Sequence, residues 1–140
     1  MEPTDKWVLP KIVWKIAIKT VSEANRSEHW SKSHKRHKQQ QLFIRLAFKR
    51  ETTKIPLPCK VRLIRVGPRC LDADENLPMA FKWIKDEISE CLIPEMRKVY
   101  VTKKGKIQAI KGRADSDPRI TWKFDQEKSK TIGIRIEFFY

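Results

Sequence analysis

Apolar residues recur at every second position in some segments of the chain and at every third or fourth position in others. This change of period constrains the fold more than any other feature. Alternating apolar residues predict strands at 12–20, 120–124 and 132–138. A further strand is expected at 59–66, between Pro58 and the Gly67-Pro68 pair. The chain therefore has strands at both ends and one in the middle.

Two helices are expected between these strands. The segment 27–50 has no Gly or Pro, and its half from Ser31 to Gln41 has no apolar residue, so that half must be solvated, mobile or laid against a ligand. The second half is expected to be anchored by Leu42, Phe43, Leu46 and Ala47. A second helix begins at Asn76 as N-cap and keeps helical spacing to Cys91, before Pro94 ends it.

This order of elements predicts one α+β domain over residues 1–140, with a small mixed sheet packed by two main helices. Residues 95–113 read either as a basic hairpin insertion or as a mobile loop. No apolar run has the ~20 residues of a membrane helix. The cysteines, Cys59, Cys70 and Cys91, are odd in number and isolated, so we expect an intracellular, cytoplasmic protein with reduced thiols.

Basic residues are concentrated in two blocks of a chain whose formal net charge is +14. Residues 26–50 hold eight Lys and Arg against one acid, and residues 97–113 hold seven and no acid. Such blocks are either solubilising faces or surfaces for a polyanion, since neutralising phosphates with release of counterions drives nucleic-acid binding. A membrane surface is disfavoured, because neither block has a continuous apolar face.

Three acids stand within five residues of this basic chain, at Asp72, Asp74 and Glu75, and a second pair follows at Asp115 and Asp117. Clustered carboxylates repel one another unless a cation lies between them. Hard cations such as Mg²⁺ prefer carboxylate oxygens, and in phosphodiester hydrolysis they activate water. The alternative is a structural role, in which the acids before the second helix cap its N-terminus and complement its dipole. Because strand and helix ends can meet at one end of a sheet, we favour a metal site built from both sets.

The residues around both acidic sets resemble a known family. The sequences LDADENLPMAFK at 71–82 and DSDPRITW at 115–122 are similar to RusA-type Holliday junction resolvases, closest to the branch found in phages and prophages. The segment NRSEHW at 25–30, which leads into the basic helix, resembles that branch too. The resemblance covers nearly the whole chain.

The resemblance implies a small α+β homodimer in the cytoplasm of a bacterium or phage-infected cell. It implies paired Mg²⁺-dependent nicks in four-way DNA junctions, with Mn²⁺ as a substitute and no small-molecule cofactor. Asp72, Asp74 and Asp117 match the family's catalytic carboxylates and metal ligands, and Lys82 matches its essential lysine. Lys82 would stabilise charge in the transition state; the alternative is a solvated helix lysine.

The first motif departs from the family pattern, because Glu75 stands between the second aspartate and Asn76. Glu75 is therefore a further candidate ligand, and Asp115 is either a ligand or a neighbour of one. Basic residues beside the motifs are assigned to DNA binding: Arg26, Lys32, Lys35, Arg36, Lys38, Arg69 and Arg119. The alternatives to a junction resolvase are a non-catalytic nucleic-acid-binding protein and a nuclease that prefers flaps or forks.

Overall fold

A computed structural model describes residues 7, 9–21, 23, 28–71, 76–94, 98–101, 103–110 and 117–140. The elements in chain order are β1 (Ile12–Ile16), α1 (Trp30–Arg50), β2 (Cys59–Gly67), α2 (Asn76–Ala80), α3 (Lys82–Leu92), β3 (Lys98–Val101), β4 (Ile107–Ile110), β5 (Ile120–Lys128) and β6 (Gly133–Phe139). Within the described ranges, no helix has both the length and the apolar character needed to cross a membrane.

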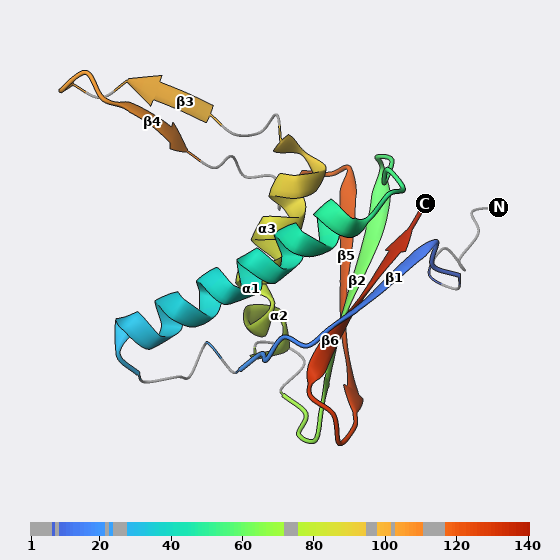
Figure 1. Ribbon diagram of the computed structural model, residues 1–140. Helices are drawn as coiled ribbons and strands as arrows, with labels where there is room; N and C mark the ends of the chain where they lie inside the picture. The colour runs from blue at the N-terminus through green and yellow to red at the C-terminus, as the bar shows by residue number, and fades with distance from the viewer. Residues whose placement is uncertain are drawn as a thin grey trace.

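The main sheet has four strands in the order β1-β6-β2-β5. Strand β6 is antiparallel to β1 and to β2, whereas β2 and β5 are parallel. Helices α1 and α3 lie together on one side of this sheet, and the β3–β4 hairpin extends away from it beyond α3 (Figure 1). The prediction of an α+β fold with a mixed sheet is confirmed. Within residues 95–113, β3 and β4 pair as an antiparallel hairpin.

The core fills the space between the sheet and the two helices. Alternate residues of β2 and β6 point into it, because successive side chains of a strand face opposite sides. Leu63 and Ile136 from the sheet meet Ile44 of α1 and Ile84 and Ile88 of α3, and none of these five side chains is exposed to solvent. Burial of each such side chain contributes about 1.5–3 kcal/mol.

Helix α1 is held by fewer apolar residues than the sequence suggested. The helix begins at Trp30. His29 is its N-cap, and the imidazole ring accepts a hydrogen bond from the Ser31 backbone N–H at 3.2 Å. Leu42 and Leu46 were expected to anchor the helix, which is wrong, because they are 47% and 38% exposed. Ile44 lies on the inward face instead and is fully buried.

The second predicted helix is divided into the short α2 and the longer α3, so that α1 and α3 are the two main helices beside the sheet. Phe81 interrupts them with a non-helical backbone, at φ −100° and ψ 2°. Its N–H donates to the Pro78 carbonyl at 3.1 Å, and its ring packs 6.0 Å from that of Phe124 in β5. The break allows a large aromatic side chain to enter the core, where it is fully buried.

Two predicted strands have different bounds in the structure: β1 is shorter, and β6 is shifted by one residue. Strand β1 ends at Ile16 rather than at residue 20, because a turn in which the Ile18 N–H donates to the Ile16 carbonyl takes the chain out of the sheet. Ile132 was grouped with the buried residues of the last strand, but it precedes β6 and is 55% exposed.

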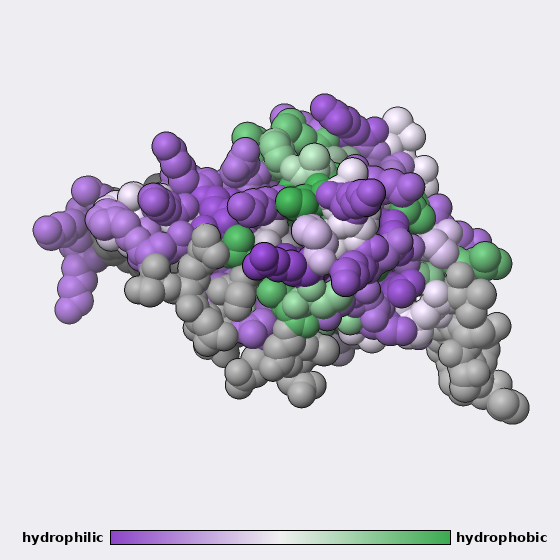
Figure 2. All heavy atoms as spheres, turned by 90° about the horizontal axis from the view of Figure 1, so that it is seen from below, coloured by the Kyte–Doolittle hydropathy of each residue, from purple (hydrophilic) through white to green (hydrophobic). Residues whose placement is uncertain are grey.

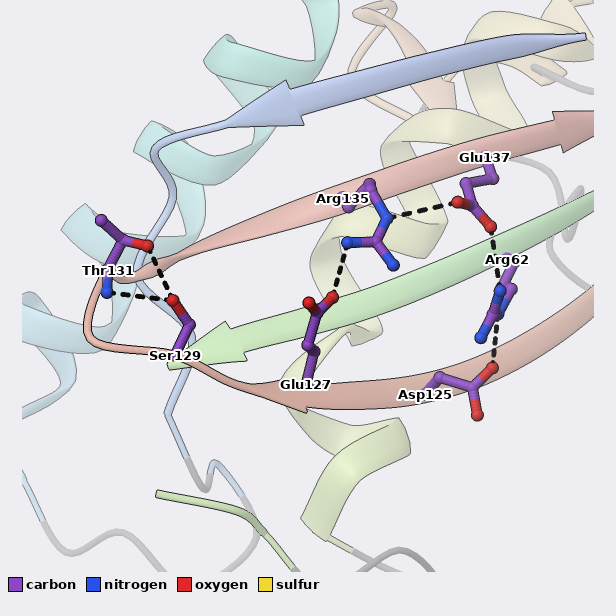
Figure 3. A network of polar contacts seen from close by, with 7 residues as sticks. All are labelled: Arg62, Asp125, Glu127, Ser129, Thr131, Arg135 and Glu137. Atoms are coloured by element: carbon purple, nitrogen blue, oxygen red, sulfur yellow. Dashed lines mark hydrogen bonds and ion pairs between the residues drawn. The ribbon is translucent and has the colours of Figure 1, made fainter. Parts of the chain in front are cut away.

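The side of the sheet away from the helices carries a network of ion pairs across three strands (Figure 3). Arg62 of β2 donates to Asp125 of β5 at 2.6 Å and to Glu137 of β6 at 3.1 Å. Arg135 donates to the same Glu137 at 3.2 Å and to Glu127 at 2.6 Å. The hydrogen bond to Asp125 raises the pKa of Arg62. The hydrogen bond to Glu127 raises the pKa of Arg135. We call these five residues the outer network.

Candidate metal and nucleic-acid site

The acidic segment begins from a fixed point on the sheet. Leu71, the last described residue before it, is held by the side chain of Gln126 in β5. The Leu71 N–H donates to Gln126 Oε1 at 2.8 Å, and Gln126 Nε2 donates to the Leu71 carbonyl at 2.7 Å. The candidate ligands Asp72, Asp74 and Glu75 lie outside the described residues, and Asn76 then begins α2.

Lys82 is the candidate catalytic cation, and it faces solvent at the first position of α3. Its Nζ lies 5.1 Å from the centroid of the Trp83 ring, within the range of a cation–π contact. The short helix α2 is fixed below it by Leu77 and Ala80, which are both buried. Lys82 is thus an exposed ammonium group on a rigid support, six residues after Asn76.

Asp117 lies three residues before β5, and its carboxylate is bound to Arg119. It accepts hydrogen bonds from the Arg119 backbone N–H at 3.0 Å and from Nε and Nη2 of that side chain at 3.1 Å. The Arg119 side chain and then its backbone N–H lower the pKa of Asp117. The carboxylate is therefore ionised and suited to a cation, but Arg119 would have to turn aside to admit one. Asp115 falls outside the described residues.

The structure does not bring the start of the acidic segment close to Asp117. Leu71 contacts Gln126, near the C-terminal end of β5, whereas Asp117 precedes the N-terminal end of the same strand. The six residues from Ile120 to Gln126 span about 20 Å at about 3.3 Å per residue. The cause is the parallel pairing of β2 and β5, since helices α2 and α3 must carry the chain back along the sheet. Leu71 and Asp117 thus lie toward opposite ends of β5, and the expected meeting of the two acidic sets stays a prediction, since residues 72–75 and 115 are outside the described residues.

The basic residues of α1 fall into two groups. Lys32, Lys35 and Lys38 are exposed. On the face of the molecule seen in Figure 2, hydrophilic side chains predominate and apolar ones form small separate patches. Arg36 is half-buried and ion-paired: Nε donates to Glu23 at 3.0 Å and Nη2 donates to Glu28 at 2.6 Å. Hydrogen bonding to Glu23 raises the pKa of Arg36. Arg36 therefore ties α1 to the segment before it, which sets it apart from the three lysines.

The remaining candidates lie near the ends of the sheet. Arg69 is exposed after β2, and its carbonyl accepts a hydrogen bond from Arg65 Nη1. Arg119 is engaged by Asp117, as described above. Arg26 lies outside the described residues. Among the residues that are described, no three His, Cys, Asp or Glu side chains form a group able to hold a metal ion.

Sequence reasoning missed two residues that organise this region. Gln126 lies beyond the predicted strand 120–124 and was given no role, and nothing in its neighbourhood along the chain signals its bonds to Leu71. His37 is half-buried and stacks on Trp83, with ring centroids 3.4 Å apart and planes 8° from parallel. No local pattern signals this stack, because Trp83 belongs to another helix, α3.

Comparison with known proteins gives no relative: no protein family, curated protein or solved structure matches this chain. Membership of the resolvase family therefore stays a prediction that depends on the two acidic motifs.

Proposed function

We propose that this protein is a Mg²⁺-dependent endonuclease that cuts branched DNA, with four-way junctions as its main substrate. One observation carries the proposal: a three-acid segment in a chain of net charge +14 starts beside β5 at Leu71 and leads into a helix pair that exposes Lys82.

The donor set fits the metal. Aspartate and glutamate oxygens at Asp72, Asp74 and Asp117, with Glu75 and Asp115 as further donors, are the hard ligands that Mg²⁺ prefers, and Mn²⁺ accepts the same ligands. When bound, the metal supplies an activated water and offsets the charge that builds on the phosphate. The chain's own contribution is positional: Lys82 presents its ammonium group toward solvent, where it can stabilise negative charge on the phosphate oxygens.

The separation of Leu71 from Asp117 favours a homodimer with shared sites. Leu71 lies at the Gln126 end of β5, whereas Asp117 precedes the other end, about 20 Å away. Since consecutive Cα atoms are about 3.8 Å apart, Asp74 can lie at most about 11 Å from Leu71. We therefore propose that each site combines the acidic segment of one copy with Asp117 of the other. Two equivalent sites related by a twofold axis suit a junction that is cut at two symmetric positions.

Cleavage of an end-labelled four-way junction tests the proposed activity, with linear duplex as the control substrate and Mg²⁺ or EDTA in the buffer. We expect symmetric nicks in the junction alone, and only with Mg²⁺. Nicks in flaps or forks but not in junctions would mean that the protein is an endonuclease with flaps or forks as its substrate. Tight binding without cleavage in any divalent metal would contradict the proposal and favour a non-catalytic DNA-binding protein.

Mixing two inactive variants tests the shared site. Asp74→Asn and Asp117→Asn are each expected to abolish cleavage by the homodimer. In the mixed dimer, one of the two shared sites keeps both native aspartates, so nicking activity should return. Sites built within one chain would leave every site with one substitution, and the mixture would then stay inactive.

A further inference from the structure

Trp30 is the most exposed large aromatic side chain among the described residues, with 71% of its surface open to solvent. Its ring lies 5.7 Å from that of His29 and 6.3 Å from that of His34, measured between centroids. Burial of an indole is strongly favourable, so an exposed one at the edge of the fold is a surface available to a ligand. Figure 1 shows this end of α1 reaching out beyond the sheet.

The exposed indole belongs to a longer row of rings, which we call the aromatic stripe: Trp30, His34, His37 and Trp83. Residues four and seven positions apart share one face of a helix, so the first three follow one another along α1 over about 10 Å. His37 then stacks on Trp83 of α3, beside which Lys82 lies. The aromatic stripe therefore connects the exposed end of α1 with the candidate catalytic lysine.

Positive charge flanks the aromatic stripe. Lys35 and Lys38 each follow a histidine of the stripe and are exposed, and α1 contains no acidic residue. The nearest carboxylate in contact is that of Glu23, 3.2 Å from His37 Nε2, and it also accepts a hydrogen bond from Arg36. The charged side chains that α1 presents beside the stripe are thus all basic, which suits a polyanion.

Aromatic faces beside lysines match one occupant best, a DNA strand with unpaired bases. Bases stack on aromatic side chains whatever their sequence, and the lysines pair with the phosphates between them. Paired bases in a duplex already stack on one another and offer no free face. We propose that the aromatic stripe, with Trp30 as its principal platform, stacks unpaired bases of DNA and directs that strand toward Lys82. This rests on the proposed function for the identity of the nucleic acid.

Substitutions at Trp30 test the proposal in the full-length protein, with a short oligothymidylate and a duplex of equal length as probes. We expect Trp30→Ala to weaken oligothymidylate binding roughly 5- to 100-fold, the range for loss of one stacked base. Duplex binding should change much less. Trp30→Phe should retain most of the affinity, whereas Trp30→Leu should not, because leucine keeps the apolar surface but offers no ring.

Leu42→Ala is the matched control, since Leu42 is 47% exposed on the same helix and outside the aromatic stripe. We expect it to leave binding unchanged. The salt dependence gives a second readout: Trp30→Ala should keep the slope of log affinity against log salt, because stacking removes no phosphate contact. Unfolding temperature should be the same for the variant and the wild type, since the removed ring is mostly solvated.

The outcomes separate this proposal from the proposed function. Equal oligothymidylate binding by wild type, Trp30→Ala and Trp30→Leu would overturn the stacking role while leaving the nuclease intact. Binding that depends on Trp30 without any cleavage would support the stripe and contradict the nuclease. A wild-type dimer that dissociates on Trp30→Ala, measured by sedimentation, would place Trp30 between copies of the chain and overturn the proposal.

Discussion

Two surfaces of this molecule are rich in charge, and they use it in opposite ways. In the outer network, two arginines and three carboxylates alternate across β5, β2 and β6, and each arginine is paired with two of the carboxylates. On the exposed half of α1, Lys32, Lys35 and Lys38 stand on a helix without a single acid. The first surface is complete by itself, whereas the second is suited to an outside polyanion.

A high number of charges does not by itself indicate a functional surface. Charges that are not paired with one another indicate it better. Glu137 is 8% exposed and lies between two arginines, so its role is to satisfy them and to link β6 to β2. Arg36, in the middle of the basic helix, belongs with this structural group because Glu23 and Glu28 hold it. Substitutions on the two surfaces should therefore affect different measurements.

The largest expected effect is on catalysis. Lys82→Ala should lower the rate of junction cleavage by about 100- to 1000-fold, as loss of one group that stabilises transition-state charge does. Junction affinity should fall far less. Lys123→Ala, on the side of the sheet that carries the outer network, is the control and should cleave at the wild-type rate. A Lys82→Ala enzyme with normal cleavage would make Lys82 an ordinary surface lysine.

DNA affinity should respond to the lysines of α1 next. Replacing Lys32, Lys35 and Lys38 together by Ala should flatten the slope of log affinity against log salt by up to about 2.7, since each phosphate contact contributes about 0.9. The matched control replaces Lys15, Lys60 and Lys123 and should leave the slope unchanged. Equal slopes for the two triple variants would exclude α1 from the DNA contact surface.

Stability should respond to the outer network. Glu137→Ala leaves Arg62 and Arg135 short of a partner and should lower the free energy of unfolding by about 1–3 kcal/mol. Glu127→Ala removes a carboxylate that is about half exposed, so its cost should stay below about 1 kcal/mol. Chemical denaturation measures both. Similar losses for the two variants would mean that burial of Glu137 has little influence.

The smallest effect concerns thiol chemistry. Burial raises the pKa of Cys59 to about 11 and that of Cys91 to about 12, so both thiols stay protonated near neutral pH. Cys70 is exposed, directly before Leu71. In the folded protein, iodoacetamide should therefore modify Cys70 alone, as mass spectrometry of peptides would show. Modification of Cys91 at the same rate would mean that the end of α3 opens readily.

Local pattern predicted much of the fold. Alternation located three strands of the main sheet, and the flanking Pro58 and Gly67-Pro68 located the fourth. Gly105, with φ +80°, marks the turn of the β3–β4 hairpin. The break at Phe81 was not predictable, because residues 77, 81, 84 and 88 keep helical spacing across it. Only the contact with Phe124, far along the chain, explains it.

The site was harder to predict than the fold, since its geometry depends on pairing between distant strands. Asp72 and Asp117 each looked like a residue at a strand end, but only the parallel pairing of β2 and β5 shows that Leu71 and Asp117 lie at opposite ends. Arg36 looked like its neighbouring lysines, and only its contacts with Glu23 and Glu28 set it apart. Long-range contacts of this kind leave no local trace in a sequence.

The most direct test compares one carboxylate from each group by the same conservative change. Asp74→Asn and Glu127→Gln each remove one negative charge and nearly conserve shape, and each variant is assayed for cleavage of a four-way junction in Mg²⁺. We predict that Asp74→Asn abolishes cleavage while still binding the junction, and that Glu127→Gln cleaves like the wild type. Normal cleavage by Asp74→Asn would contradict the account, because the acidic segment would then have no catalytic role.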